Sequence, residues 1–411
     1  MEKEDLKKYC ELIVKAGVNL YEGQNLAIGC GIRNADFALM LADTAYECGA
    51  GYVDIIFNSN ELTRSRVDHA KKAANINFMP NYPISRGFEQ IANDWAFIRI
   101  DNLEEINVLK SLDANILSTI TKNEQSALKA MSKAIASAKI AWCIVAAPGL
   151  NWAAKVFDSE PYSELENKLW DSLTKILRLD KPNPVKEWKN LGKKLVKRGN
   201  LLTDLKIDKL VFTGPDTDLE IGLTRNAVWR GGLVKAQNGR EFIPNLPTEE
   251  VFTCPDFSRT NGKVKVTKPV KVLENLLTGI WFEFKDGKVV DFGTDDNREI
   301  LEKYFEIDEG ASYLGEVALV DINSEVYKSG LILNSILYDE NAACHIALGR
   351  GIPMCFSNKD EIITPADMRL NKCNESVVHT DFMIGSEFIN VKATDYDGLD
   401  HQIIKDGLFV I

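Results

Sequence analysis

The sequence predicts an α/β N-terminal domain with a mainly parallel sheet and an α+β C-terminal domain rich in antiparallel strands. Three observations support this fold class. The chain has 411 residues, which is more than one hydrophobic core usually serves. Its first half alternates strand-like and helix-like stretches, as parallel βαβ units do. Its second half contains short apolar runs with a tight turn between two of them, which favours antiparallel pairing.

The N-terminal half contains apolar, strand-like runs that are separated by helical stretches. A helical pattern follows the first run and stops at Gly49. The runs span 25–28, 52–57, 96–100 and 140–145, and the first helical pattern spans 35–47. Because the runs alternate with helical patterns, we expect them to pair in parallel within one sheet.

The two halves of the sequence meet in a helical region. Helical patterns span 163–179 and 185–205, and Lys-Pro-Asn-Pro at 181–184 separates them. We place the domain boundary in this region. The expected organisation is therefore an α/β domain over 1–190 and an α+β domain over 191–411.

The C-terminal half reads as a set of short strands. Strand-like runs occur at 210–212, 219–221 and 279–284. Asp-Gly at 286–287 follows the last of these and leads into a further run at 288–292. This dipeptide between two apolar runs is a strong hairpin signal, so we expect much of this domain to be antiparallel.

Composition and charge limit the classes of function. Hydrophobic residues make up 45% of the chain and charged residues 27%, as in ordinary globular proteins. The net charge of −11 argues against nucleic acid as a partner, because phosphate binding needs a basic surface. No segment approaches the roughly 20 apolar residues that span a bilayer, so no membrane partner is expected.

The cysteines and the N-terminal residues indicate a cytoplasmic protein. The eight cysteines are scattered and include no Cys-x-x-Cys pair, so we expect reduced, buried thiols. Residues 6–16 predict an amphipathic helix, and they lack the unbroken apolar stretch of a signal peptide.

Several common enzyme motifs are absent or broken. Gly29-Cys30-Gly31 follows a strand-like run, but the third glycine of a dinucleotide-binding pattern would fall at Asn34. A tight strand-to-helix turn explains these glycines better. The chain also lacks a phosphate loop, a Gly-x-Ser-x-Gly elbow and a His-Glu-x-x-His helix.

A histidine beside a carboxylate is the best indication of chemistry. His379 and Asp381 are two positions apart in a strand-like run, so their side chains project from the same face. An imidazole and a carboxylate presented together suit a divalent metal ion. The alternative is a hydrogen bond between them without a metal, and this pair alone does not separate the two interpretations.

Other acids stand at the starts of apolar strands. Glu249 and Glu250 lie between a proline turn and a short strand, and neighbours on a strand face opposite ways, so at most one points into a given site. Glu316 enters an apolar strand, where a charge costs several kcal/mol unless it is paired or bound to a metal. The alternative for each acid is a solvated strand end.

Glu340 and His345 raise a geometric difficulty. A short helix is predicted over 341–348, with Asp339 as its cap and Gly349 as its end. Five positions correspond to about 140° around a regular helix, so Glu340 and His345 do not share a helical face. Both side chains reach one site only if Glu340 precedes the helix.

Four blocks in the C-terminal half together resemble one family, the thermophilic-type bacterial metalloaminopeptidases of the aminopeptidase S and aminopeptidase T group. The blocks are Pro-Thr-Glu-Glu-Val-Phe-Thr at 247–253, Leu-Gly-Glu-Val-Ala-Leu-Val at 314–320, Asp-Glu-Asn-Ala-Ala-Cys-His at 339–345 and His-x-Asp-Phe-Met-Ile-Gly-Ser at 379–386. Their order and spacing also fit. The likeness extends through the chain and is weakest in the N-terminal half.

The resemblance implies a metal site in the C-terminal domain with two adjacent divalent ions. The ligands it implies are Glu250, Glu316, Glu340, His345, His379 and Asp381, with Glu316 as the bridge between the ions. This set contains imidazole and oxygen but no thiolate, so zinc, cobalt, manganese and magnesium all remain possible. The family is generally homodimeric, with its site facing an enclosed cavity. Small peptides with a free N-terminus are therefore the expected substrates.

The expected reaction is removal of the first residue of a peptide. Two metals about 3.5–4 Å apart share a water and lower its pKa toward neutrality. Coordination of the free amine would restrict cleavage to the first residue. A carboxylate near the water carries its proton to the leaving amine, and Glu249 or an acid that holds no metal is the candidate.

One position departs from the family, and two other interpretations remain. The family usually has a tyrosine seven residues after the position of His345, where this chain has Ile352. Losing one hydrogen-bond donor to a developing oxyanion can cost on the order of 100-fold in rate. The alternative function is therefore a metal-binding homologue with weak or no peptidase activity. A cysteine hydrolase using Cys344 is a third interpretation, which we disfavour because adjacent residues rarely aim at one another.

Overall fold

In the computed structural model, the chain folds into two compact units. The structure describes residues 3–105, 107–273, 275–362 and 364–411. Unit 1 consists of Met1–Asn190 and Leu233–Pro247, and unit 2 consists of Leu191–Gly232 and Thr248–Ile411. Unit 1 therefore includes a short segment from the C-terminal half of the sequence.

Unit 1 is built on a parallel sheet, as the sequence predicts. The strand order is β2-β1-β3-β4, and each neighbouring pair is parallel. The strands are β1 (Leu26–Gly31), β2 (Val53–Asn58), β3 (Ala96–Ile100) and β4 (Trp142–Val145). All residues of β1 are buried, which explains why it reads as a continuous apolar run rather than an alternating one.

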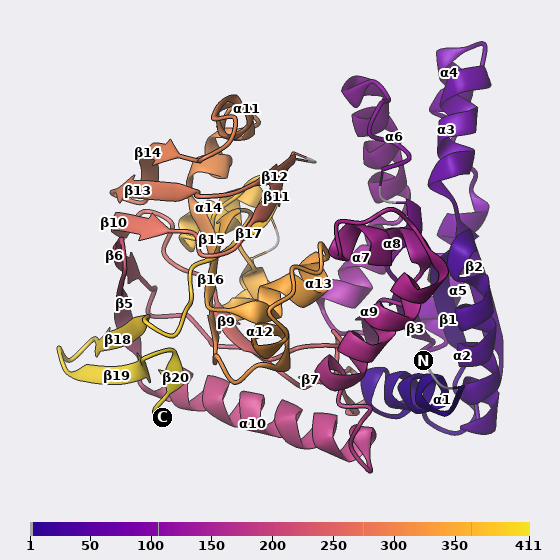
Figure 1. Cartoon of the computed structure of the whole chain (residues 1–411), viewed down its shortest axis with the longest axis horizontal. Coiled ribbons are helices and arrows are strands. Elements are labelled where there is room, and N and C mark those ends of the chain that lie inside the picture. The colour runs from indigo at the N-terminus through magenta and orange to yellow at the C-terminus, as the bar shows by residue number, and fades with distance from the viewer. Residues whose placement is uncertain (1–2, 106, 274, 363) are drawn as a thin grey trace. The chain divides into compact units, whose positions relative to one another are not determined.

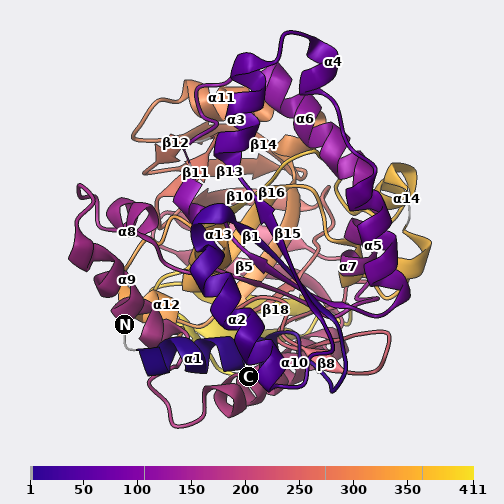
Figure 2. The same cartoon turned by 90° about the vertical axis from the view of Figure 1, so that its right-hand side faces the viewer.

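Helices connect these strands and cover the sheet. Helix α1 packs against α2, and α2 buries Phe37, Leu41 and Ala45 (Figure 2). The helices of this part of the chain are α1 (Lys3–Leu12), α2 (Ala35–Glu47), α3 (Asn60–His69), α4 (Ala73–Ile76), α5 (Tyr82–Ala92), α6 (Ala114–Ala127), α7 (Lys129–Ala136), α8 (Leu150–Val156), α9 (Ser163–Ile176) and α10 (Pro184–Asp204). A π-helical turn, Ile13–Gly17, follows α1, and 3-10 turns occur at Ile32–Asn34 and Leu103–Glu105. A small antiparallel pair, β7 (Val234–Lys235) and β8 (Glu241–Phe242), completes unit 1.

Unit 2 contains a large antiparallel sheet, in agreement with the prediction for the C-terminal half. Its order is β14-β13-β10-β6-β5-β18-β19-β20 (Figure 1). The strands are β5 (Ile207–Gly214), β6 (Thr217–Gly222), β10 (Thr260–Lys265), β13 (Trp281–Lys285), β14 (Lys288–Gly293), β18 (Asn390–Asp395), β19 (Asp400–Lys405) and β20 (Leu408–Phe409). The predicted turn between β13 and β14 is present, with positive φ at both Asp286 and Gly287.

A second antiparallel sheet in unit 2 carries the candidate functional residues. Its order is β17-β16-β15-β9. The strands are β9 (Glu250–Thr253), β15 (Leu314–Val320), β16 (His345–Gly349) and β17 (His379–Met383). The two sheets share one hydrophobic core, in which the rings of Phe282 and Phe382 meet edge to face with centroids 4.9 Å apart.

Short elements complete unit 2. A two-stranded hairpin consists of β11 (Val270–Val272) and β12 (Asn275–Leu277). The helices are α11 (Glu299–Phe305), α12 (Glu325–Ser329), α13 (Ile336–Asp339) and α14 (Pro365–Leu370). Single 3-10 turns lie at Glu309–Ser312, Glu340–Ala342, Pro353–Cys355 and Lys359–Glu361. No helix in the described part of the chain is long and apolar enough to cross a membrane.

The predicted helix over 341–348 is wrong. The chain forms a 3-10 turn at Glu340–Ala342 and then the strand β16, in which all five residues are buried. A short apolar run has no helical or strand period of its own, and here pairing with β15 and β17 decides the outcome. The angular objection to Glu340 and His345 sharing a site therefore does not apply.

Candidate metal centre

The candidate ligands project from one face of the sheet β17-β16-β15-β9. In that sheet Glu316 is level with Ala347, and Ala347 is level with Asp381. Two residues further along β15, Ala318 is level with His345 on one neighbouring strand and with Phe252 on the other. Residues level across strands share a face, and so do residues two apart along a strand. Glu250, Glu316, His345, His379 and Asp381 consequently lie on the same face.

The opposite face of this sheet is apolar. Val251, Val317, Ile346, Leu348 and Phe382 alternate with the candidate ligands and lie in the shared core. This alternation fixes the register, because a shift by one residue would place the acids in the apolar core and the core residues among the polar ligands. On the ligand face, Ala318 and Ala347 have only methyl groups, which leaves space between the longer side chains.

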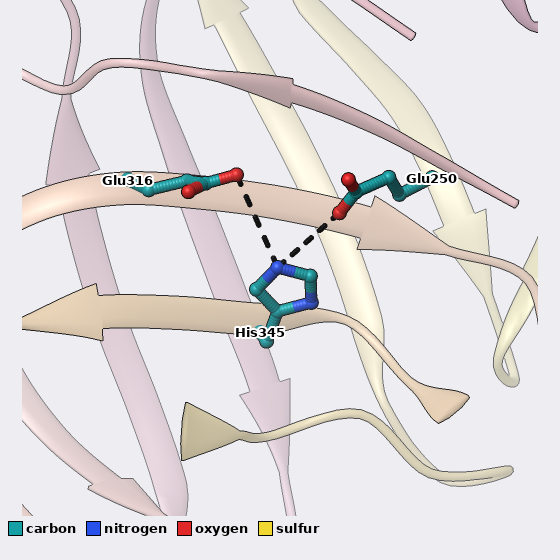
Figure 3. A group of neighbouring side chains, drawn as sticks. All are labelled: Glu250, Glu316 and His345. Atoms are coloured by element: carbon teal, nitrogen blue, oxygen red, sulfur yellow. Dashed lines mark ion pairs between the residues drawn. The ribbon is translucent and has the colours of Figure 1, made fainter. Parts of the chain in front are cut away.

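The first compact group consists of Glu250, Glu316 and His345 (Figure 3). One ligand atom from each residue lies within 4.8 Å of the others. His345 Nε2 is 3.3 Å from Glu250 Oε2 and 4.0 Å from Glu316 Oε1. His345 is only 1% exposed, so this group is closed off from solvent.

The second compact group consists of Glu316, His379 and Asp381. His379 Nε2 is 3.2 Å from Glu316 Oε2 and 3.5 Å from Asp381 Oδ1. The predicted projection of His379 and Asp381 from one face is therefore confirmed. Glu316 belongs to both groups and directs one carboxylate oxygen to each histidine.

Backbone carbonyls orient both imidazoles. Nδ1 of His345 is 3.2 Å from the carbonyl oxygen of Ala343, and Nδ1 of His379 is 2.7 Å from that of Arg350. A carbonyl only accepts hydrogen bonds, so each Nδ1 carries a proton and donates. This leaves Nε2 of each ring for a metal, the arrangement usual for histidine ligands. The sequence does not reveal these two carbonyls, because every residue has one.

The centre has an excess of negative charge. Burial and the nearby carboxylates of Glu316 and Asp381 raise the pKa of Glu250 well above its usual value. Burial alone would lower the pKa of His379, but its contacts with Asp381 and Glu316 raise it to about 11. Burial acts to raise the pKa of Asp381, yet the contact with His379 lowers it overall. These directions show that the cluster stabilises a positive charge among its acids.

A metal ion fits the side chains that are present. Oε2 of Glu250 is buried and has no hydrogen-bond partner in the described part of the chain. An unpaired buried acceptor costs free energy, and several buried carboxylates in one place cost more. A divalent cation beside Glu250, Glu316 and His345 would satisfy that oxygen and offset the repulsion.

Glu340 lies near the centre but outside both compact groups. It occupies the 3-10 turn just before β16 and is partly buried. Burial raises its pKa well above the usual value, and so do the charges of Glu250, Asp381 and Glu316. The structure therefore brings Glu340 within electrostatic reach of the other acids.

Glu249 is placed differently from its neighbour. Its carboxylate oxygen Oε1 accepts a hydrogen bond from the backbone N–H of Glu325, 3.2 Å away at the start of α12. Its own backbone N–H donates to Oδ1 of Asn341 at 2.6 Å. Only Glu250 of the adjacent pair belongs to a compact group, which agrees with the expected opposition of strand neighbours.

Two other residues from the sequence analysis belong to neither compact group. Cys344 is buried in the shared core, and its thiol donates to the carbonyl of Val320 at 3.3 Å. Burial raises the pKa of this thiol to about 12, which argues against a nucleophile. Ile352 is partly buried and packs against an apolar cluster that includes Cys254 and Cys355.

The side chains that the sheet brings together are suited to holding divalent metal ions. The chain matches the model of the thermophilic metalloprotease family (M29) over residues 2–409. It therefore belongs to this family, as the resemblance in the C-terminal blocks predicts.

Characterised relatives resemble the chain over its full length. Aminopeptidase 2 of Geobacillus stearothermophilus is 35% identical, and the match covers 98% of this chain and 97% of that protein. Aminopeptidase T of Thermus aquaticus is 33% identical, with 99% of each covered. The structure of wild-type AmpT from Thermus thermophilus superposes with a TM-score of 0.90 at 31% identity, and all of both chains is covered.

Proposed function

We propose that this protein is a metal-dependent aminopeptidase that removes the first residue of small peptides. Glu316 carries the proposal, because its two oxygens lie beside two different histidines in two separate groups. A carboxylate in that position suits a bridge between two divalent ions. The names of the relatives, aminopeptidases 2 and T, support the same reaction class.

The proposed ligands divide into two sets around Glu316. Glu250 and His345 would hold one ion, and His379 and Asp381 the other. Glu340, which adds a further acid near both sets, is the sixth proposed ligand. Imidazole and carboxylate ligands are compatible with zinc, cobalt, manganese or magnesium.

The bound ions would supply an activated water and polarise the scissile carbonyl. The chain's own residues would orient the metal ligands and carry a proton. The carbonyls of Ala343 and Arg350 hold the two imidazoles in one orientation and tautomer. We propose Glu249 as the group that carries a proton to the leaving amine, since it is buried and adjoins Glu250 in the chain.

The proposed setting is the cytoplasm, with the protein acting as a homodimer on peptides with a free N-terminus. All eight cysteines are free, although Sγ of Cys254 and Sγ of Cys373 are only 3.7 Å apart. Free thiols at that distance suit a reducing compartment. Sedimentation of the purified protein measures the oligomeric state.

A direct assay tests the activity. Purified protein, dialysed against a chelator and then supplied with each divalent metal in turn, should cleave amino-acid p-nitroanilides only when metal is present. N-acetylated forms of the same substrates serve as the control, because they lack the free amine. Equal cleavage of free and acetylated substrates would exclude an aminopeptidase.

A metal-binding homologue with little peptidase activity is the second candidate, and Ile352 favours it. An isoleucine has no hydrogen-bond donor to offer a developing oxyanion. Under this alternative, metal analysis would find ions bound to each chain while every peptide substrate remained intact.

A further inference from the structure

A cavity of about 210 Å³ adjoins the metal centre in unit 2. Asp381 and Glu340 lie in its wall, so it reaches the acids of the centre. The apolar part of its lining comprises Pro269, Val270, Leu273, Leu276, Ile332, Ile336 and Met383, and Lys271, Asn334, Ser335, Asp339 and Thr380 supply the polar part. A cavity that joins a polar centre to an aliphatic wall is suited to one side chain of a bound substrate.

Three elements form the cavity and are fixed to one another. The β11–β12 hairpin supplies Val270, Leu273 and Leu276, and β17 ends at Met383. The chain just before the hairpin is attached to β17, because the backbone N–H of Thr267 donates to the carbonyl of Met383 at 2.8 Å. The third element is the segment that leads into α13.

A partly buried carboxylate, that of Asp339, stabilises that third element. Asp339 accepts hydrogen bonds from the backbone N–H groups of Leu333 at 2.8 Å and Ser335 at 3.1 Å. The acid is therefore engaged in shaping the segment that carries Ile332 and Ile336.

Apolar side chains are exposed at the same place. Leu273 is 43% exposed, Leu276 is 50% exposed and Ile336 is 66% exposed. All three side chains line the same cavity, although they come from two different elements. Single exposed apolar residues are common on protein surfaces, but a group of them at one cavity indicates a binding site. Contact with an apolar ligand group would remove this surface from water.

We propose that this cavity binds the side chain of the substrate's first residue and selects large, uncharged aliphatic side chains such as those of leucine and methionine. The proposal rests on the aminopeptidase function proposed above. An engineered cavity of about 150 Å³ holds benzene, so about 210 Å³ accommodates a leucine side chain.

The test compares p-nitroanilides of leucine, alanine, glutamate and lysine with wild-type protein and two variants. Wild type should favour leucine over alanine by about 10-fold or more in kcat/KM. Leu276→Trp fills the cavity mouth and should reduce that ratio to near one. Leu276→Ala removes apolar contact and should lower the ratio as well, which provides a second variant if the tryptophan prevents folding.

The matched control is Val290→Trp. Val290 is 53% exposed on β14 of the same unit and lies outside the cavity lining. Its leucine-to-alanine ratio should equal that of wild type. A wild-type ratio near one, or an equal fall on all substrates in Leu276→Trp, would overturn the cavity proposal while leaving the aminopeptidase function intact.

Calorimetry separates failure of the cavity from failure of the proposed function. If no free-amine substrate is cleaved, the aminopeptidase function fails, and binding of L-leucine and glycine to zinc-loaded protein decides the cavity. Tighter binding of leucine in wild type, lost in Leu276→Trp, supports the cavity, and equal binding of both amino acids overturns it. A change in sedimentation of Leu276→Trp with an unchanged substrate ratio would assign the patch to a second copy of the chain and overturn the proposal.

Discussion

The two halves of the candidate metal centre differ in their access to solvent. The group around His345 is sealed, with His345 and Glu250 almost wholly buried. The group around His379 lies at the edge, where that side chain is 33% exposed while Asp381 is 9% exposed. Both groups share Glu316 and the same sheet face.

The two histidines also differ in their position in the sheet. His345 lies on β16, which has β15 on one side and β17 on the other, whereas His379 begins the edge strand β17. We infer that the buried group holds its ion for structure as well as chemistry. Under the proposed function, the edge group, which adjoins the aliphatic cavity through Asp381, is the one that a substrate would reach first.

The largest expected effect comes from the residue that the two groups share. Glu316→Gln keeps the size of the side chain but removes its charge, so both groups lose a ligand together. Loss of an outer-shell partner alone costs about 10–100-fold, so we expect activity to fall by more than about 100-fold. Metal analysis should find fewer than one tightly bound ion per chain.

The control for Glu316→Gln is a variant in which a nearby acid outside both compact groups loses its charge. Glu249→Gln alters a buried carboxylate that belongs to neither compact group, and it should leave the metal content unchanged while lowering kcat. Full metal occupancy and full activity in Glu316→Gln would show that the two groups do not depend on a common ligand.

The second prediction concerns Ile352. This residue lies two positions after Arg350, whose carbonyl orients His379, and its side chain packs against the apolar cluster that includes Cys254 and Cys355. Ile352→Tyr installs a hydrogen-bond donor of the kind the family usually has there, and kcat should rise by up to about 100-fold. Ile352→Phe, which has the ring without the hydroxyl, is the control. An equal rate in both variants would exclude hydrogen bonding as the cause.

The third prediction separates the two histidines by stability. His345→Ala leaves Glu250 and Glu316 buried without their imidazole, so the free energy of unfolding should fall by roughly 1–3 kcal/mol. His379→Ala affects an edge position, and its cost should be within about 1 kcal/mol. Urea unfolding of both variants, each with and without zinc, measures the difference. Equal losses would remove the distinction between a structural and an accessible group.

Features of the fold and site that follow from a local periodic pattern or a turn motif could be predicted from the sequence. The alternation of His379 and Asp381 is a period-two pattern, so their common face was readable without a structure. The parallel and antiparallel halves followed from helices between strands and from the Asp-Gly turn. The sequence predicts a helix over 341–348 where the structure has β16, because five buried residues between two strands show no period.

Other features of the site had no signal in the sequence at all. The level rows that bring Glu316 and Asp381 together across Ala347 depend on strand register, which is a long-range property. The ligand set was therefore predicted from the family resemblance and not from strand register. The aliphatic cavity is assembled from three separated segments, and no single segment shows a binding pattern.

The last prediction concerns the pH dependence of stability when metal is removed. Burial and neighbouring charges raise the pKa of Glu250 and Glu340, so without metal these groups bind protons more tightly in the folded state. Stability from such groups is present below the usual carboxyl pKa and is lost as pH rises through the raised value. The metal-free protein should therefore become less stable from pH 5 to pH 7, by at most about 1.4 kcal/mol per pH unit for each group.

The other two shifted groups of the centre do not reverse this trend. The lowered pKa of Asp381 gives a contribution that is already complete above pH 5. The pKa of His379, raised to about 11, gives a contribution that declines only between its usual value and pH 11. Metal-loaded protein should show the opposite slope, because protons compete with metal for the same carboxylates and bind less as pH rises. Urea midpoints at pH 5 and pH 7, with and without zinc, measure both slopes. Parallel slopes would mean that the acids of the buried group are not the ones that bind the metal.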